Sequence, residues 1–463
     1  VSLLMGALVP VLTVLLVHEL WPEDLALALL AGALVAVCGQ LWQSSVVVMS
    51  DTTGLAVATF SAFALARYAR GGSGAWLVLA GAAIAYATLA RWIYGLVAIP
   101  FATYGLIVLI ERSRRRRSSS AAQAHSASRI EPPAKAISPR TALVHAVAAV
   151  AVAALILVPA VAQPLIGLLR DPAQPATFAG NFQVYSWSPL NALRHDFFTA
   201  DGHLAYSQPN GVYYALASAN FAYFGPLLAV WILPGLWAAW RWRARDILLI
   251  VGWAAIVFVF HAGAPWQNFR FALAYLPPVA ILAAAGLLLT WRWFDARGSD
   301  GVSLAADPAE HPHRTARVAV RAIVGVCVIV GLLSTAAAAA RLVERFIDAK
   351  DQELALVHWV QSEAPANAEL FTFGETLTFR HYTSMPTFDL FDVSASDVRD
   401  IVSDPAPHYL LVDVGSVESQ WLNQAPSTNY HVLRDEVGLK ELGTQGGYTL
   451  YQVDAPRDAK AAQ

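Results

Sequence analysis

The amino-acid sequence predicts an all-α, multi-pass membrane bundle of about ten transmembrane helices, followed by a small α/β domain outside the membrane. Three observations support this fold class. The 463 residues are 57% hydrophobic and only 14% charged, which is too little charge to cover a water-exposed surface. Long apolar stretches recur up to about residue 340, and the residues after them return to a soluble composition with charges of both signs.

Ten stretches are long enough, and free enough of charge, to cross a hydrocarbon core about 30 Å thick. Together they predict a transmembrane domain at 1–341. The cysteines Cys38 and Cys327 lie within apolar runs, so they form neither a disulfide framework nor a zinc-binding pattern. The expected spans are 2–18, 25–46, 52–66, 74–90, 92–110, 142–163, 222–240, 247–264, 271–291 and 322–340.

Basic residues predict the orientation of these helices, because loops rich in Lys and Arg stay in the cytoplasm. Such residues gather in alternate loops, and two of these loops, 112–141 and 292–319, are rich in Ser, Ala, Pro and Arg and are expected to be disordered. The loop at 164–221 and the domain at 342–463 then lie outside. Arg and Ala are abundant, as in a GC-rich prokaryotic genome, so we expect a prokaryotic cytoplasmic (inner) membrane. The intervening outer loops up to residue 340 hold Arg91, Arg170, Arg194 and Arg270.

The segment 342–463 is predicted to be a small α/β domain. Apolar runs typical of strands alternate with segments of helical periodicity. No Gly-rich phosphate-binding loop occurs in it, so we do not expect a nucleotide site. The expected helices are 353–363 and 398–402, and the expected strands are 370–373, 388–391, 409–414 and 448–453.

Asp51 is the first candidate for a functional site. It lies in the sequence SDTTG, between two apolar stretches, on the expected outer side. In one interpretation Asp51 only caps the helix that follows. In the other, its carboxylate lies at the lip of a cavity and binds a divalent metal ion or an acceptor hydroxyl.

Two arginines are the next candidates, because positive charge is scarce on the outer side. Arg91 lies in the tight turn LARWIYG, and Arg270 lies in WQNFRFALAY. A guanidinium group binds a phosphate in a bidentate manner and neutralises the charge of a departing phosphate. The alternative is that both anchor the chain among lipid headgroups. Their neighbours Tyr94, Gln267 and Asn268 are further candidates for substrate contacts.

The outer loop at 164–221 contains aromatic and polar residues that suit a carbohydrate, whose C–H faces stack on rings while its hydroxyls bind polar groups. Arg194 and His195 are the candidates from this loop. An amphipathic helix lying in the interface would have a similar composition. Adjacent residues rarely face each other, so His195 and Asp196 are only weak evidence for a catalytic pair.

Three segments carry a resemblance to a known family: VSLLMGALVPVLTVLLVHEL, VVVMSDTTGLAVATFSAFALARY and LARWIYGLVAIPF. They resemble the membrane core of the polyprenyl-phosphate-dependent glycosyltransferases of the GT-C class, such as protein O-mannosyltransferases and aminoarabinose transferases. The stretch WQNFRFALAYLPPVAILAAAGL is similar to a late outer loop and helix of the same group. The resemblance covers most of the chain through short motifs.

The resemblance implies an enzyme that transfers a sugar, with inversion, from a polyprenyl-phosphate donor to a glycan, lipid or protein acceptor at the outer membrane face. It implies that Asp51 binds metal or acceptor, and that Arg91 and Arg270 lie near the donor phosphate. In the family the catalytic base is an acidic residue of the first outer loop. Val1 matches the start of the third family helix, so we expect that loop and its base to be absent from this sequence.

Two other classes of protein remain as alternatives. A multi-pass transporter would place ionisable residues and interrupted helices near the membrane midplane, whereas the charges here cluster at the outer ends of the spans. A non-catalytic membrane scaffold that presents the 342–463 domain would need fewer spans than we expect. No nucleic-acid partner is expected, because the net charge is −2.

Overall fold

The computed structural model describes residues 1–47, 49–122, 137–170, 186–199, 201–299 and 311–454. The chain divides into two compact units. The first comprises Val1–Leu193 and Gln208–Val343, and the second comprises Arg194–Ser207 and Glu344–Gln463.

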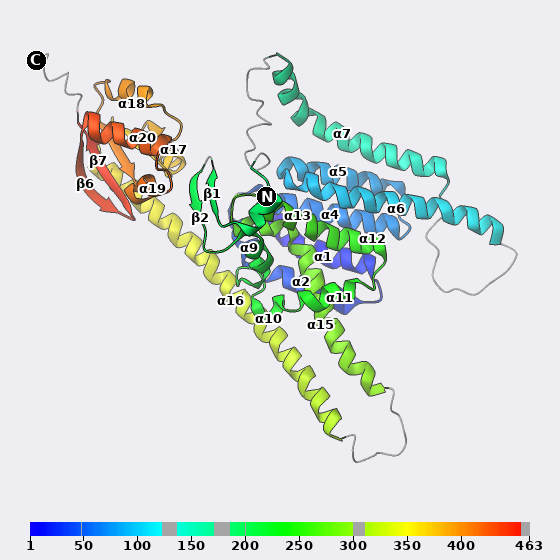
Figure 1. Cartoon of the computed structure of the whole chain (residues 1–463). Coiled ribbons are helices and arrows are strands. Elements are labelled where there is room, and N and C mark those ends of the chain that lie inside the picture. The colour runs from blue at the N-terminus through cyan, green and yellow to red at the C-terminus, as the bar shows by residue number, and fades with distance from the viewer. Residues whose placement is uncertain (48, 123–136, 171–185, 200, 300–310, 455–463) are drawn as a thin grey trace, which may run out of the picture. The chain divides into compact units, whose positions relative to one another are not determined.

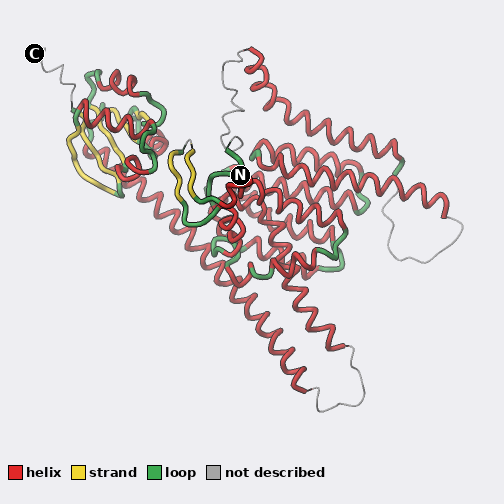
Figure 2. Tube along the Cα trace, in the orientation of Figure 1, coloured by secondary structure: helices red, strands yellow, loops and turns green. Residues whose placement is uncertain are grey.

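The first unit is a bundle of helices rich in Ala, Leu and Val (Figures 1 and 2). A helix satisfies its backbone hydrogen bonds internally, which apolar surroundings demand. The helices are α1 (Ser2–Leu20), α2 (Leu25–Ala36), α3 (Gly39–Val46), α4 (Ser50–Ala69), α5 (Gly74–Ala90), α6 (Ile93–Ala122), α7 (Pro139–Arg170), α9 (Asn210–Leu216), α10 (Pro226–Ala229), α11 (Ile232–Ala239), α12 (Ala244–Ile247), α13 (Trp253–Gly263), α14 (Phe269–Ala272), α15 (Leu276–Ser299) and the first part of α16 (His311–Glu363). Short 3-10 helices lie at Pro189–Leu193, Ala217–Ala219 and Leu273–Tyr275, and a π-helical turn lies at Leu248–Gly252.

Within the described residues, six helices are long and apolar enough to cross a membrane, or seven if α2 and α3, which meet at a bend of 55°, form one span. This confirms a mostly helical chain with several membrane spans, but the ten expected spans are not confirmed. The apolar helices at 74–90 and 226–239 are shorter than a full span. The expected span 52–66 is α4, which is buried among its neighbours and begins with the polar residues Ser50, Asp51 and Thr52.

Two expected cytoplasmic loops are partly helical. α6 runs on to Ala122 and α7 begins at Pro139, so only 123–136 of the expected loop 112–141 lies outside the described residues. Likewise, α15 extends to Ser299 and α16 begins at His311, on either side of 300–310. Arg and Ala have high intrinsic helix propensity. This explains why α6 and α15 continue into the expected loops and why α7 and α16 begin within them.

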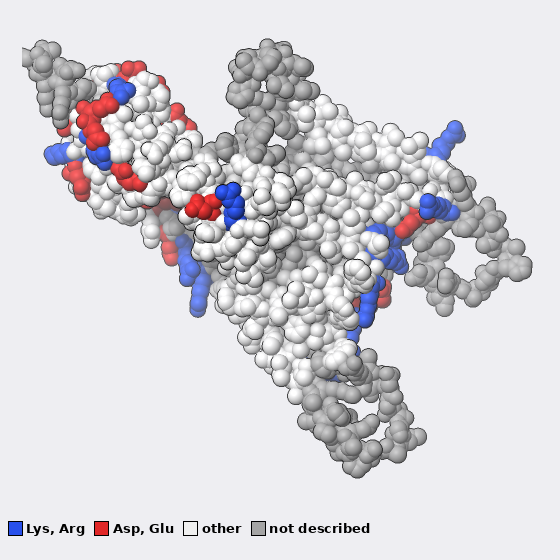
Figure 3. Space-filling view, viewed as in Figure 1, with Lys and Arg blue, Asp and Glu red and all other residues white. Residues whose placement is uncertain are grey.

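Charged side chains of the first unit gather at the two ends of α4. We call one the Asp51 end, where Asp51 lies near Arg91 and Arg270. We call the other the Arg70 end, where Arg112 donates hydrogen bonds to the carbonyl oxygens of Tyr68 and Gly72. Figure 3 shows broad surfaces of this unit without charged residues, whereas the C-terminal unit carries both signs.

Two glycines allow α11 and α15 to pack backbone against backbone. A Cβ atom at Gly286 would lie 2.0 Å from the carbonyl oxygen of Trp231, and one at Gly235 would lie 1.8 Å from that of Leu282. Small residues at helix contacts let membrane helices approach closely. This contact holds α15, which follows directly on the short helix that carries Arg270.

The second unit contains a five-stranded mixed sheet in the order β4-β3-β5-β7-β6. β3 runs parallel to β4 and β5, and β7 runs antiparallel to β5 and β6. The strands are β3 (Glu369–Thr372), β4 (Thr387–Asp389), β5 (His408–Val412), β6 (Leu439–Gln445) and β7 (Tyr448–Val453). The helices are the end of α16, α17 (Thr376–Tyr382), α18 (Ala395–Val402), α19 (Val414–Ser419) and α20 (Ala425–His431), with a π-helical turn at Val432–Val437.

The central strand β5 is buried along its whole length. Leu410 and Val412 join an apolar cluster with α18, whereas Tyr409 and Leu411 join a cluster with the end of α16. Successive side chains of a strand point to opposite faces, so helices cover both faces of this sheet. The expected small C-terminal domain is therefore confirmed, and its four expected strands correspond to β3, β4, β5 and β7. β6 was not expected.

A hairpin encoded between helices of the first unit belongs to the second. Its strands are β1 (Asp196–Thr199) and β2 (Gly202–Ala205), which pair antiparallel. The backbone N–H of His203 donates to the carbonyl oxygen of Gln420 over 2.9 Å, and the Gln420 side chain donates to the carbonyl oxygen of Asp201 over 2.8 Å. These hydrogen bonds attach the hairpin to the C-terminal segment of the same unit.

The contact between α11 and α15 yields the first prediction. Gly286→Ala should lower the free energy of unfolding by about 1–3 kcal/mol, because the added methyl group forces the two helices apart. Thermal unfolding of the detergent-purified protein measures the effect. Gly325→Ala is the matched control, since the nearest atom to its Cβ would lie 3.8 Å away. Equal unfolding temperatures for the two variants would contradict the prediction.

Candidate functional site

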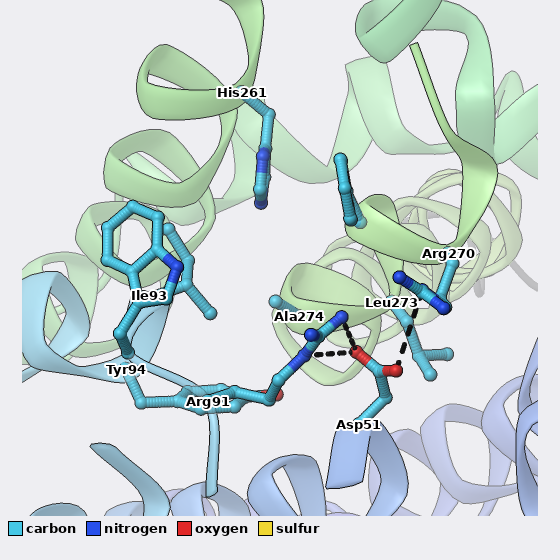
Figure 4. A pocket seen from close by; sticks show the side chains of 10 residues that line it. Asp51, Arg91, Ile93, Tyr94, His261, Arg270, Leu273 and Ala274 are labelled. Carbon is cyan, nitrogen blue, oxygen red and sulfur yellow. Dashed lines mark hydrogen bonds and ion pairs between the residues drawn. The ribbon is translucent and has the colours of Figure 1, made fainter. Parts of the chain in front are cut away.

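A cavity of about 230 Å³ lies at the Asp51 end of the first unit (Figure 4). Three charged side chains and one histidine share it with apolar and aromatic groups. Its lining residues are Asp51, Arg91, Trp92, Ile93, Tyr94, His261, Arg270, Phe271, Leu273 and Ala274. The structure thus brings together four of the residues singled out in the sequence, namely Asp51, Arg91, Tyr94 and Arg270.

Asp51 lies between the two arginines. Its Oδ1 accepts a hydrogen bond from Nε of Arg91 over 2.6 Å and lies 2.5 Å from Nη2, while its Oδ2 lies 3.6 Å from Nε of Arg270. The interpretation of Asp51 as an N-cap is wrong, because Met49 occupies the cap position and Asp51 lies in the first turn of α4. An acid in the first turn is still favoured by the helix dipole.

Arg91 is positioned by the tight connection between α5 and α6. Its backbone closes α5 through a hydrogen bond to Ala87, and its carbonyl oxygen accepts from the backbone of Tyr94, in the first turn of α6. Gly54 allows this turn to approach α4, since a Cβ there would lie 2.7 Å from the ring of Tyr94. Tyr94 is fully buried, so it supports Arg91 from within the bundle.

Arg270 lies in the first turn of α14. Asn268 caps this helix, and its side chain accepts a hydrogen bond from the backbone N–H of Arg270 over 2.9 Å. The Arg270 side chain donates from Nη1 to the sulfur atom of Met49. Its Nε atom is buried and, among the described residues, has no hydrogen-bond partner, because 3.6 Å to Asp51 is too long for one.

His261 is a site residue that the sequence analysis missed. It lies in the last turn of α13, and its ring stacks on that of Phe271, with centroids 5.1 Å apart. Its Nε2 atom is buried and has no hydrogen-bond partner among the described residues. In Figure 4 the ring extends into the cavity toward the arginines. The available signal was a lone histidine near the end of an apolar span, within HAGAPWQN.

Gln267 and Asn268 do not line the cavity; they hold the segment that leads to Arg270. The Gln267 side chain donates to the carbonyl oxygen of Gln208 and to the side chain of Asn210. Asn268 is the helix cap described above, and its backbone N–H donates to the hydroxyl of Tyr214. Their hydrogen bonds give them a structural role, and their expected role in binding substrate stays a prediction.

Arg194 and His195 belong to the second unit and are not among the residues that line the cavity of the first. The Arg194 guanidinium lies 5.9 Å from the ring centroid of Phe197. The backbone carbonyl oxygen of His195 accepts a hydrogen bond from Tyr206, and the carboxylate of Asp196 pairs with His203 over 2.6 Å. The carboxylate of Asp196 thus pairs with His203 rather than with its neighbour His195.

The residues at this cavity do not fit the expected metal ion. Asp51 is the one carboxylate among the ten described residues that line it, and both of its oxygens face guanidinium groups. Hard divalent cations such as Mg²⁺ and Ca²⁺ are held by carboxylate oxygens that are free to coordinate them. No group of three or more His, Cys, Asp or Glu side chains with suitable geometry occurs in the part of the chain that the structure describes.

The charge of the cavity suits an anion. Two guanidinium groups face one carboxylate, which leaves an excess of positive charge. About a third of each arginine side chain is exposed, 29% for Arg91 and 31% for Arg270, compared with 10% for Asp51. Each guanidinium offers five N–H donors, so donors remain for a ligand after those that serve Asp51.

Comparison with known proteins connects this fold to a class of enzymes. The family model described as dolichyl-phosphate-mannose-protein mannosyltransferase matches residues 1–163. These residues include Asp51 and Arg91. No curated protein matches the chain in sequence.

Solved structures share the fold at low identity. ArnT from Cupriavidus metallidurans in the apo state has a TM-score of 0.55 and 15% identity, covering 97% of this chain and 82% of that chain. The same ArnT bound to undecaprenyl phosphate has a TM-score of 0.52 and 13% identity, with 97% and 83% covered. The Archaeoglobus fulgidus oligosaccharyltransferase tethered with an acceptor peptide has a TM-score of 0.51 and 14% identity, with 98% and 62% covered.

The family match and the shared fold confirm the resemblance to the polyprenyl-phosphate-dependent glycosyltransferases of the GT-C class. The chain is a multi-pass membrane protein whose first 163 residues match a family of lipid-linked mannosyltransferases.

The ion pairs of Asp51 yield the second prediction. Asp51→Asn keeps the side-chain volume but removes the charge that holds two guanidinium groups together, so the free energy of unfolding should fall by about 1–3 kcal/mol. The measurement is the thermal unfolding midpoint of the purified protein. Asp351→Asn, at an exposed position of α16, is the control and should leave the midpoint unchanged. If both variants unfold at the wild-type temperature, Asp51 does not hold the site together.

Proposed function

We propose that the cavity at the Asp51 end binds the phosphate of a polyprenyl-phosphate sugar and that the enzyme transfers the sugar to a glycan, lipid or protein acceptor. One observation carries the proposal. Arg91 and Arg270, held together by Asp51, line the same cavity as His261. Nε of Arg270 and Nε2 of His261 are buried and have no hydrogen-bond partner in the described part of the chain. Buried polar atoms without partners are costly, and a phosphate would satisfy both of them.

The proposed chemistry follows from the leaving group. The acceptor oxygen attacks the anomeric carbon from the face opposite the phosphate, so that the new bond forms with inversion as the old one breaks. The electron pair of the broken bond stays on the phosphate oxygen, where Arg91 and Arg270 stabilise the charge. The acceptor proton goes to a base, which the family resemblance places in the first outer loop.

Asp51 is a positioning residue in this proposal. Both oxygens of its carboxylate face guanidinium groups, so neither oxygen is free to contact an acceptor. It keeps Arg91 and Arg270 close enough to bind the same phosphate group. The expected role of Asp51 in binding metal or acceptor is therefore not part of the proposal.

We also propose that the Asp51 end faces the outside of a prokaryotic cytoplasmic membrane. The support is the distribution of basic residues, which lie mainly in the loops at the Arg70 end. A site outside the cytoplasm has no access to nucleotide sugars, which agrees with a donor carried on a lipid. The same orientation places the second unit outside.

The interrupted helices α2 and α3 do not favour the alternative of a transporter. The polar groups at their break bind within the bundle, since the backbone N–H of Gln40 and the thiol of Cys38 both donate to the carbonyl oxygen of Ala222. Gly39 packs directly against Ala339 on α16. Transporters instead use the free groups of broken helices to bind substrate or ions.

The third prediction concerns the arginines. Arg91→Ala and Arg270→Ala should each weaken the binding of undecaprenyl phosphate by about 10- to 100-fold, because each removes charged hydrogen bonds to the phosphate. Native mass spectrometry or lipid-dependent thermal stabilisation measures the affinity. Arg341→Ala, at an exposed position of α16, is the matched control. Wild-type affinity in both site variants would refute the proposed phosphate site.

The fourth prediction concerns His261. His261→Phe retains the stacking on Phe271 but removes Nε2, so undecaprenyl phosphate should bind about 10-fold more weakly at an unchanged unfolding temperature. His18→Phe replaces an exposed histidine of the same unit and should have no effect on affinity. If His261→Phe binds the lipid as tightly as the wild type, the histidine serves packing alone.

A further inference from the structure

A second and larger cavity, of about 660 Å³, lies at the Arg70 end of the first unit. It is formed where the connection between α1 and α2, the end of α4, α6 and the connection between α11 and α12 meet. Its volume falls within the range of about 300–1,000 Å³ typical of small-molecule sites. The mechanism proposed above uses none of its residues.

Two buried carboxylates in this cavity each have one oxygen without a hydrogen-bond donor among the described residues. The side chain of Glu19 is only 8% exposed, and that of Asp246 only 5%. Oε2 of Glu19 and Oδ1 of Asp246 have no hydrogen-bond partner among the described residues. Oε1 of Glu19 accepts a hydrogen bond from Arg67 over 2.9 Å. In contrast, Oε2 of Glu19 lies 3.6 Å from Arg70 and Oδ1 of Asp246 lies 3.5 Å from Arg245, which is too far for a hydrogen bond. A ligand that brings N–H donors would satisfy both oxygens.

Aromatic rings line the same cavity. Trp21 and Trp242 lie in contact, with ring centroids 4.6 Å apart and planes inclined at 45°. The faces of tryptophan rings attract organic cations. Buried carboxylates together with tryptophan rings therefore form surroundings that suit an ammonium group.

Positive charge lies beside these rings. Arg241 and Arg243 flank Trp242 in the chain, line the cavity and are exposed. Exposed arginines that border a cavity are suited to a phosphate group. The cavity thus offers acceptors for an ammonium group in its buried part and donors for a phosphate at its exposed part.

We propose that this cavity binds the headgroup of a phospholipid that carries a primary ammonium group next to its phosphate, as in phosphatidylethanolamine. Membrane-spanning helices end here, where headgroups are at hand, and tryptophan is favoured at this depth. A quaternary ammonium group has no N–H donors, so phosphatidylcholine would leave Glu19 and Asp246 unsatisfied. An anionic headgroup without an amine would bring negative charge toward the same two carboxylates.

Lipid selectivity tests the proposal. The full chain, purified in detergent, is titrated with dioleoyl phosphatidylethanolamine, phosphatidylcholine and phosphatidylglycerol, and binding is followed by native mass spectrometry. We expect phosphatidylethanolamine to bind at least about 10-fold more tightly than the other two lipids, and glycerophosphoethanolamine to compete with it. Equal binding of the three lipids, or a lack of competition, would overturn the proposal.

Variants locate the site. Glu19→Gln and Arg243→Ala should each weaken the binding of phosphatidylethanolamine by about 10-fold, whereas Arg341→Ala and Arg91→Ala should not. Arg243 is exposed, and the structure gives it no ion pair among the described residues, so Arg243→Ala should fold normally. Wild-type selectivity in both Glu19→Gln and Arg243→Ala would place the lipid elsewhere. Retained binding in Arg91→Ala separates this site from the proposed catalytic one.

Discussion

The candidate site depends on one carboxylate that lies between two guanidinium groups. Arg91 and Arg270 come from connections far apart in the sequence, and in a poorly solvated bundle their positive charges would repel each other. Asp51 neutralises part of that charge and fixes both side chains relative to the start of α4. The close contact at Gly54 and the cap at Asn268 set the backbone positions from which the arginines reach Asp51.

The cavities at the Asp51 end and the Arg70 end have opposite polar chemistry. At the Asp51 end, the unsatisfied Nε atom of Arg270 is a donor. At the Arg70 end, the unsatisfied oxygens of Glu19 and Asp246 are acceptors. Since buried polar atoms are rarely left without partners, the two cavities are suited to ligands of different kinds, and α4 runs from one to the other.

The sequence predicted the convergence of Asp51, Arg91 and Arg270, because charge is scarce on one side of the spans and each such residue stands out. It could not predict that Asp51 would be fully engaged by the arginines, since that depends on side-chain geometry. His261 was missed because a lone histidine in an apolar span carries no distinguishing pattern. The number of membrane spans was not predicted correctly where the helices are short or polar. The strand β6 was missed because its sequence, LKELGTQ, lacks the apolar alternation of a typical strand.

The hairpin at Arg194–Ser207 determines which residues a separately produced C-terminal unit must contain. A soluble fragment cut at Glu344 would lack two strands and would leave the backbone carbonyl of Gln420 without its N–H donor. Fusing the hairpin segment to that fragment through a flexible linker would restore the missing partner.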